Sequence, residues 1–270
     1  MSGRGTALVT GASSGIGLEF TKLLARDGYD LVMVARSGAL MAETAQELEE
    51  RHGITVTVLP KDLARVNAAH DVLDNLAQRH LTIDVLVNSA GFNQFARFVE
   101  SDEDVMHDLL QVNVVALTQL TRGLLPSMVL RRRGMVINLS SNAAFQPGPQ
   151  MACYYASKAY VLNLSLALTE EVRGTGVTVT ALCPGPTATG FQTRAEMEDS
   201  KLVSGRELAS PAEVAAWGYE VAKRGKPFAV HGARWQGFAF ATRLVPRSTA
   251  ARMALRAQER VEHPRDRRDR

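Results

Sequence analysis

Short β-branched apolar runs alternate with longer amphipathic segments along most of the chain, and this alternation limits the folds open to it. The apolar runs occupy residues 7–10, 31–34, 54–59, 84–87, 135–139 and 177–182, with a weaker one at 228–230. The segments with helical spacing occupy residues 17–26, 38–51, 66–79, 104–130, 153–173 and 211–223. Strands that are apolar on both faces and separated by helices predict a parallel sheet covered on both sides. We therefore expect an α/β fold, a doubly wound parallel sheet of about seven strands with helices on both faces.

Residues that end or begin helices agree with this division. Gly28 and Gly53 follow two of the expected helices, where a left-handed cap is needed. Ser210, Pro211 and Glu213 fit an N-cap, a first-turn proline and a capping-box glutamate. No repeat or linker divides the sequence, and 46% of its residues are hydrophobic. We expect one domain over residues 1–250.

Composition excludes several classes of protein. No stretch approaches the roughly 20 apolar residues of a transmembrane helix, and the first expected strand begins too soon after Met1 for a cleavable targeting segment. Two cysteines, Cys153 and Cys183, and six scattered histidines show no spacing typical of metal ligands. We expect free thiols, no metal and a cytoplasmic protein.

The net charge of +3 lies at the C-terminus. Residues 251–270 hold seven arginines and four acidic residues, which is also +3, so residues 1–250 are neutral overall. Arginines and aspartates interspersed over 265–270 are typical of a solvated chain end. We expect residues 251–270 to be a basic, frayed tail, and prefer this to contact with nucleic acid or an anionic membrane.

A glycine-rich turn follows the first apolar run, in the sequence Thr10-Gly-Ala-Ser-Ser-Gly-Ile-Gly17. Its first glycine permits a tight exit from the strand, the second lets the backbone approach a pyrophosphate, and the third lets the next helix pack on the sheet. The N-terminus of that helix offers N–H groups to phosphates. Such a loop could be only a turn, but in the first strand–turn–helix unit we predict nucleotide binding. The residues expected to bind are Gly11, Ser13, Ser14, Gly15, Ile16 and Gly17.

This glycine spacing resembles the short-chain dehydrogenase/reductase family. Further matches follow in the family's order from residue 10 to residue 189, about two-thirds of the chain. Asp62-Leu63 resembles the adenine-contacting pair, Asn88-Ser-Ala-Gly91 resembles the Asn-Asn-Ala-Gly signature, and Pro184-Gly185 begins a segment that resembles the one lining the nicotinamide. Ser89 departs from the pattern. The resemblance implies cofactor contacts with Asp62, Leu63, Asn88, Ala90, Gly91, Pro184, Gly185, Thr187 and Thr189.

The end of the second apolar run bears on the choice of cofactor. An acidic residue there would hold the ribose 2′-hydroxyl and repel a 2′-phosphate, but this chain has Ala35 and then Arg36. Arginine suits a phosphate by charge and by its fork geometry. Arg36 could also be an ordinary surface cation. We expect NADP(H) rather than NAD(H).

Tyr154 and Lys158 stand one helical turn apart, so they share a helix face. A lysine cation, together with a positive nicotinamide, favours phenolate and should lower the pKa of the phenol towards neutrality. Tyr155 lacks a lysine four residues on, and the family pattern Tyr-x-x-x-Lys also selects Tyr154. The resemblance implies that Tyr154 exchanges a proton with the substrate oxygen, and that Tyr154 and Lys158 both contact the cofactor.

Two more polar residues complete the predicted site. Ser141 lies 13 residues before Tyr154 at the end of a strand, where a hydroxyl can donate to the substrate oxygen. The family's spacing selects it over Ser140. Asn113 lies in an apolar helical stretch, where an amide needs a partner. It could be only a helix-bending residue, but the resemblance implies a proton relay to Lys158.

The resemblance implies reduction of a ketone or aldehyde to an alcohol. Expected walls at 92–95 and 143–151 contain aromatic residues and Met151 but no lysine or arginine, so an apolar carbonyl substrate is expected; those side chains could equally be core. Residues 190–209 form a candidate lid. An alcohol dehydrogenase working in the oxidative direction, or a non-catalytic NADP(H)-binding regulator, stays open.

The C-terminal part departs from the family's pattern. The Asp-Gly-Gly expected after residues 228–231 is missing, and residues 232–247 are rich in aromatic residues and arginine. This segment could close the pocket, bind a partner subunit or rest peripherally on a membrane. The resemblance implies a homodimer or homotetramer.

Overall fold

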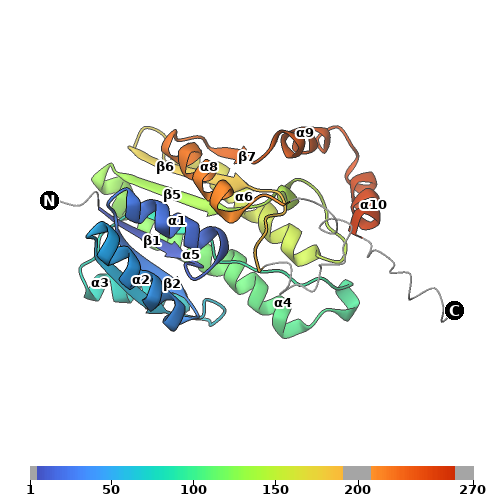
Figure 1. Ribbon diagram of the computed structural model, residues 1–270. Helices are drawn as coiled ribbons and strands as arrows, with labels where there is room; N and C mark the ends of the chain where they lie inside the picture. Colours follow the sequence, from blue (N-terminus) through green and yellow to red (C-terminus); the bar gives the residue numbers. More distant parts are fainter. Residues whose placement is uncertain (1–4, 191–207, 259–270) are drawn as a thin grey trace.

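A seven-stranded parallel sheet lies between two layers of helices in the computed structural model, which describes residues 5–190 and 208–258 (Figure 1). The strands are β1 (Thr6–Thr10), β2 (Asp30–Ala35), β3 (Val56–Pro60), β4 (Ile83–Asn88), β5 (Gly134–Leu139), β6 (Val177–Cys183) and β7 (Phe228–Val230). The main helices are α1 (Gly15–Arg26), α2 (Gly38–His52), α3 (Ala68–Gln78), α4 (Glu103–Leu110), α5 (Leu117–Arg131), α6 (Ala152–Glu171), α8 (Pro211–Lys223), α9 (Ala233–Ala241) and α10 (Arg247–Gln258). The predicted fold class is confirmed.

The strand order is β3-β2-β1-β4-β5-β6-β7. The chain moves outward in one direction from β1 to β3 and then returns to the other side of β1 at β4. The loops that follow β1 and β4 therefore leave the sheet in opposite directions and open a crevice at its carboxyl edge, the place where open α/β sheets bind ligands.

Successive residues of the central strands face two separate cores. Ala7 and Val9 of β1 belong to the core under α1, α2 and α8, whereas Leu8 belongs to the core under α3 and α5. Because side chains alternate between the faces of a strand, a strand covered on both sides must be apolar throughout. This is the physical reason for the continuous apolar runs.

The predicted glycine caps, the Ser210 N-cap and the first-turn proline are present, whereas the Glu213 carboxylate lies 3.4 Å from His231 Nε2. Gly53 caps α2 with a left-handed φ of 64°, and Gly28 follows α1 with a φ of 83°. The Ser210 hydroxyl accepts a hydrogen bond of 3.1 Å from the Glu213 backbone N–H, and Pro211 is the first residue of α8.

The helix expected over residues 104–130 is divided. The π-helical turn η2 (Gln111–Ala116) separates α4 from α5. Such turns recur at functional sites because they displace a side chain from the regular helical positions. Here the turn contains Asn113. The apolar periodicity of the sequence did not predict this break in the helix.

The prediction of a frayed tail is wrong at its start, because residues 251–258 belong to α10. Ala250, Ala254 and Gln258 are buried at a spacing of four along that helix. The packing of α10 depends on small alanines that lie among arginines. Such a sequence lacks the apolar periodicity that predicts a buried helix face. Residues 259–270, and residues 191–207 of the expected lid, lie outside the described residues. None of the helices that the structure describes is both long enough and apolar enough to cross a bilayer.

Candidate functional site

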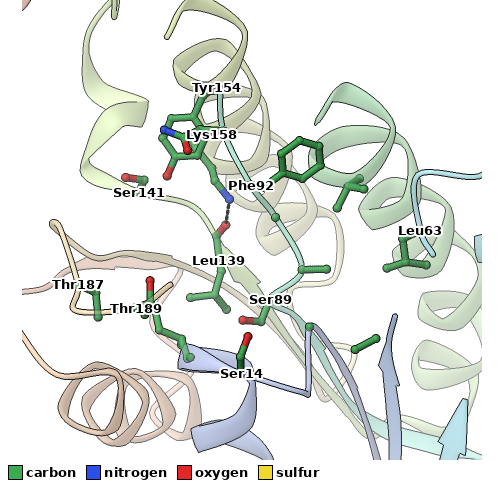
Figure 2. Close-up of a pocket in the computed structure, with 18 of the residues that line it drawn as sticks. Ser14, Leu63, Ser89, Phe92, Leu139, Ser141, Tyr154, Lys158, Thr187 and Thr189 are labelled. Carbon is green, nitrogen blue, oxygen red and sulfur yellow. Dashed lines mark hydrogen bonds between the residues drawn. The ribbon is translucent and has the colours of Figure 1, made fainter. Parts of the chain in front are cut away.

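A cavity of about 560 Å³ opens at the carboxyl edge of the sheet (Figure 2). Loops after six of the strands contribute to its walls, together with the beginning of α6. It brings together most of the residues predicted from the sequence: Gly11, Ser13, Ser14, Gly15, Ile16, Arg36, Asp62, Leu63, Ala90, Gly91, Ser141, Tyr154, Lys158, Pro184, Gly185, Thr187 and Thr189.

The glycine loop has the close packing that its sequence suggests. Gly11 has a φ of 69°, and a Cβ there would lie 3.0 Å from the backbone of Ala90. Gly15 has a φ of 56° and begins α1. Ser14, the N-cap of α1, makes no side-chain capping bond, and the first turn of the helix holds no acidic residue. These features fit the pyrophosphate of a dinucleotide at the start of α1.

Three predicted residues do not line the cavity. A Cβ on Gly17 would run into the Gly11 carbonyl, so this glycine lets α1 approach the loop. Asn88 is buried below the cavity, where its amide donates to Thr121 Oγ1 at 3.0 Å and Asn138 Oδ1 at 2.9 Å. Asn113 is 1% exposed and lies behind the cavity wall. Direct cofactor contact is therefore not supported for Gly17 and Asn88.

Two basic residues line the cavity after neighbouring strands, together with the acidic residue Asp62. Arg36 follows β2, and Lys61 follows the neighbouring strand β3, where its backbone N–H donates to the Ala35 carbonyl at 2.9 Å. Ser37 lines the same end and makes no capping bond at the start of α2. Sequence reasoning missed Lys61 and Ser37, although the parallel pairing of β2 with β3 would bring their ends together. Lys61 Nζ pairs with Asp71 at 2.8 Å.

Ser141, Tyr154 and Lys158 meet at the other end (Figure 2). The Lys158 ammonium donates to the Leu139 carbonyl at 2.8 Å and lies 5.7 Å from the centre of the Tyr154 ring. Ser141 Oγ accepts from the Ala143 N–H and donates to Asn142 Oδ1, each at 3.1 Å. It also forms a hydrogen bond with the Tyr154 hydroxyl. The predicted hydroxyl, phenol and ammonium are thus neighbours.

Burial sets the acidity of these groups. The removal of the Tyr154 hydroxyl from bulk water raises its pKa above the usual value, and the bond to Ser141 offsets only part of this rise. The expectation that Lys158 would lower the pKa of Tyr154 is therefore not met by the protein's own residues. Burial also lowers the pKa of Lys158 to about 8.

Asn113 holds the backbone of the loop after β4. Its Oδ1 accepts from the Phe92 N–H at 3.1 Å, and its Nδ2 donates to the Phe92 carbonyl at 3.0 Å and to Ser157 Oγ at 3.2 Å. A Cβ on Gly91 would lie 3.0 Å from Asn113 Oδ1 and 3.4 Å from Lys158 Nζ. Asn113 Oδ1 and Lys158 Nζ therefore both lie beside Gly91.

The wall beside Tyr154 is mainly apolar. Phe92, Ala143 and Met151 line the cavity as predicted, and Tyr155, Asn93 and Asn142 line it as well. Phe95 and Phe145 do not line the cavity: they are partly buried, and pack against the cluster of Ala143, Met151 and Tyr155 and beside Trp235, respectively. Both cysteines are free thiols, and Cys183 is buried below Ser140.

Known proteins are similar in sequence to about two thirds of this chain. The chain is 39% identical over 176 residues to a very-long-chain 3-oxoacyl-CoA reductase of Laccaria bicolor, an alignment that covers 64% of this chain and 52% of that protein. It is 32% identical over 182 residues to the 17-beta-hydroxysteroid dehydrogenase type 3 of Mus musculus, covering 66% of this chain and 58% of that one. The chain thus spans little more than half the length of these relatives.

Solved structures match over nearly the whole chain. A short-chain dehydrogenase from Sphingobium yanoikuyae in complex with NADPH is 31% identical, with a TM-score of 0.79 over 97% of this chain and 99% of that one. The bulky-bulky ketone specific alcohol dehydrogenase from Comamonas testosteroni is 28% identical, with a TM-score of 0.76 over the full length of both.

The family model described as short chain dehydrogenase matches residues 5–200. That match covers the glycine loop, all the strands up to β6 and the Ser141, Tyr154 and Lys158 group. The chain belongs to the short-chain dehydrogenase/reductase family of oxidoreductases.

Proposed function

We propose that this oxidoreductase is an NADP(H)-dependent ketoreductase that reduces an apolar ketone or aldehyde to an alcohol. The observation that carries the proposal is the convergence of Ser141, Tyr154 and Lys158 at one end of the cavity whose other end contains Arg36. A proton donor and a phosphate-binding end are then separated along a single elongated site, as a dinucleotide with its substrate requires.

Tyr154 is the proposed acid. Bound NADPH supplies the hydride that adds to the carbonyl carbon. The Tyr154 phenol, kept neutral by the raised pKa that burial causes, transfers its proton to the carbonyl oxygen as that oxygen gains electrons. The product is an alcohol, and the proton lost by Tyr154 is restored from solvent. A raised pKa suits this direction, because the phenol stays protonated at neutral pH.

Ser141 is the proposed second donor to the substrate oxygen. Its single hydrogen points to Asn142 Oδ1 in this structure, so it must rotate towards the substrate. The Ala143 N–H, which donates to Ser141 Oγ, keeps that oxygen in place during the rotation. Once its hydrogen points to the substrate oxygen, where negative charge develops, this donor stabilises the transition state more than the ground state.

Lys158 and Asn113 are the proposed route by which Tyr154 regains its proton. The Lys158 ammonium is held beneath the phenol by the Leu139 carbonyl. Asn113 uses both amide hydrogens on the protein, while its Oδ1 accepts one bond from Phe92 and keeps a second lone pair. That lone pair, close to Lys158 Nζ, can accept from a water in the relay.

NADP(H) is the proposed cofactor because the end of β2 carries Arg36 instead of an acid. Ser37 adds a hydroxyl on the same side, beside Lys61, whose ammonium is paired with Asp71. The Sphingobium yanoikuyae structure, which contains NADPH, agrees with this choice. The residues proposed to contact the cofactor are the predicted ones that line the cavity.

The proposed substrate is bulky and apolar. Phe92, Ala143 and Met151 supply apolar side chains to the wall beside Tyr154. Lys158 also lines the cavity there, but its ammonium is bonded to the Leu139 carbonyl. The names of the relatives, which refer to very-long-chain acyl groups, a hydroxysteroid and bulky ketones, agree with an apolar substrate. A dehydrogenase acting on the matching alcohol would use the same groups in reverse.

A panel of carbonyl compounds tests the proposal. The purified protein would be incubated with NADPH and with short ketones, aryl ketones, steroid ketones and 3-oxoacyl thioesters, and the loss of NADPH absorbance would be followed. We expect turnover with at least one apolar ketone and a kcat/KM at least tenfold higher with NADPH than with NADH. Absence of turnover across the panel in both directions would instead support a non-catalytic NADP(H)-binding protein.

A further inference from the structure

The segment that follows the last strand contacts the substrate end of the cavity from behind. Trp235 of α9 packs against the loop after β6, where a Cβ on Gly185 would run into the indole ring. Gln258, the last residue of α10, reaches Tyr155 near the start of α6. Figure 1 shows α9 and α10 leaving the sheet after β7 and extending past its end. Residues that depart from the family's sequence pattern therefore support the walls of the site.

The contact between Gln258 and Tyr155 is buried. Gln258 Nε2 donates to the Tyr155 hydroxyl at 2.7 Å, and the two side chains are 1% and 8% exposed. Gln258 continues the buried positions of Ala250 and Ala254 along α10. Within the described residues its Oε1 has no hydrogen-bond partner. A buried amide is costly unless it is bonded, so the bond to Tyr155 is the feature that accounts for a glutamine here.

Tyr155 is fixed at both ends of its side chain. Its ring lies on Gly148, where a Cβ would overlap the ring atoms. Its edge meets the Tyr154 ring, with centroids 6.1 Å apart and planes inclined by 77°. Ala143 and Met151 complete the cluster, and Gln258 holds the hydroxyl. Without that bond the ring is still packed, but its hydroxyl has nothing to hold it at its present angle.

We propose that Gln258 is a positioning residue that fixes Tyr155, and that Tyr155 thereby limits the size of the carbonyl substituent accepted beside Tyr154. The inference rests on the proposed ketoreductase function. Loss of the bond leaves the Tyr155 ring in its packed cluster but lets the hydroxyl end of the ring tilt, which enlarges the space for the substrate beside Tyr154. The C-terminal helix α10 then determines substrate selectivity although it does not line the cavity.

The test compares a bulky aryl ketone with a compact aliphatic ketone. Gln258→Leu and Tyr155→Phe each remove the bond and nearly preserve volume. We expect the ratio of kcat/KM for the bulky ketone to that for the compact ketone to rise about tenfold in each variant, a change typical of a pocket altered by one small group. In the double variant the ratio should be no higher than in either single variant, because both substitutions break the same bond.

The matched control is Gln236→Leu. Gln236 also belongs to the C-terminal segment, but it donates to the Val230 carbonyl at 3.1 Å, away from Tyr155. Gln236→Leu should leave the ratio of kcat/KM for the two ketones unchanged. All the variants should bind NADPH with the affinity of the parent. An equal loss of activity towards both ketones, or additive effects in the double variant, would overturn the proposal.

A second measurement does not depend on turnover. The five tyrosines can be labelled with 3-fluorotyrosine, and the fluorine resonance of Tyr155 identified by its absence in Tyr155→Phe. We expect this resonance to shift or broaden in Gln258→Leu and to stay unchanged in Gln236→Leu. An unchanged resonance in Gln258→Leu would refute the positioning role, whereas a wild-type protein inactive on all carbonyls would refute the proposed function alone.

Discussion

Burial acts in opposite directions on the two ionisable residues beside the proposed reaction centre. It raises the pKa of the Tyr154 phenol and lowers the pKa of Lys158 to about 8. Each shift favours the neutral form of the group. The sequence identified both residues and their shared helix face, but it suggested a lower pKa for Tyr154. The spacing of residues in the sequence predicts which groups are neighbours. The pKa of each group also depends on how deeply it is buried, which the whole fold determines.

The pKa of Lys158 predicts the pH dependence of reduction. Lys158 is positively charged below about pH 8 and neutral above it. If the ammonium returns the proton to Tyr154, kcat/KM should be constant below that pH and fall about tenfold per pH unit above it, because kcat/KM reports ionisation in the free enzyme. In Lys158→Arg, whose side chain stays charged, the kcat/KM of the residual activity should no longer fall above about pH 8. A flat profile up to pH 10 in the parent would contradict the role of Lys158.

Arg36 is expected to determine the preference for NADP(H). Arg36→Ala should weaken NADPH binding by about tenfold to a hundredfold, since a charge-assisted bond to phosphate is lost, and should leave NADH binding nearly unchanged. Fluorescence titration with each cofactor measures both constants. Arg51→Ala, on the exposed end of α2, is the control and should change neither. If Arg36→Ala weakened the binding of NADPH and NADH equally, Arg36 would not contact the 2′-phosphate.

Buried amides connect the elements below the cavity. Asn88 of β4 donates to Asn138 of β5 at 2.9 Å, and Asn138 donates to Ser165 of α6 at 2.9 Å. The family's asparagine signature at residue 88 thus joins strands and a helix. The sequence located this residue but not its function, because its partners lie 33 and 50 residues away.

Removal of the central amide should destabilise the fold. Asn138→Leu removes the acceptor of one Asn88 amide hydrogen and the donor to Ser165 Oγ, although Asn88 keeps its bond to Thr121 and Ser165 its bond to the Val161 carbonyl. We expect a cost of about 2 kcal/mol in the free energy of unfolding, within the range of about 1–3 kcal/mol for buried unsatisfied groups. Urea unfolding measures the loss. Asn163→Ala, which removes only an exposed side-chain bond to the backbone of α6, should cost less than about 0.5 kcal/mol. Equal stability of Asn138→Leu and the parent would contradict this role of the amides.

Strands were easier to predict than the helices that shape the site. The strands of the doubly covered sheet are apolar throughout, so their sequence signal is strong. The π-helical turn at Asn113 leaves no such signal, because one added residue hardly alters an apolar stretch. Helix α10 has alanines on its buried face and arginines elsewhere, and its hydrogen bond from Gln258 reaches Tyr155, a residue 103 positions away in the sequence.

On the scale of the whole molecule, the position of the cavity follows from the order of the strands. A sheet whose order reverses between β1 and β4 opens a crevice at its carboxyl edge, and the predicted motifs follow strands that end there. The order of the motifs in the sequence therefore predicted most of the site. The residues it missed, such as Lys61 and Tyr155, reach the cavity through pairing and packing between distant segments.

We also predict that the protein is a homodimer or homotetramer. Leu110 of α4, Leu130 of α5 and Tyr160 of α6 are large apolar side chains that are 41%, 85% and 40% exposed in the single chain. Light scattering coupled to gel filtration should give two or four times the mass of the chain, because burial of such side chains stabilises association. A single-chain mass at micromolar concentration would contradict the prediction.

The most direct test of the enzymatic account is the substitution Tyr154→Phe, which removes only the proposed acid. Turnover of the best ketone should fall by about a thousandfold, within the range expected for loss of a general acid. The dissociation constant for NADPH should stay within about twofold of the parent, and Tyr155→Phe should still turn over the compact ketone. Retention of most activity by Tyr154→Phe would show that another group supplies the proton.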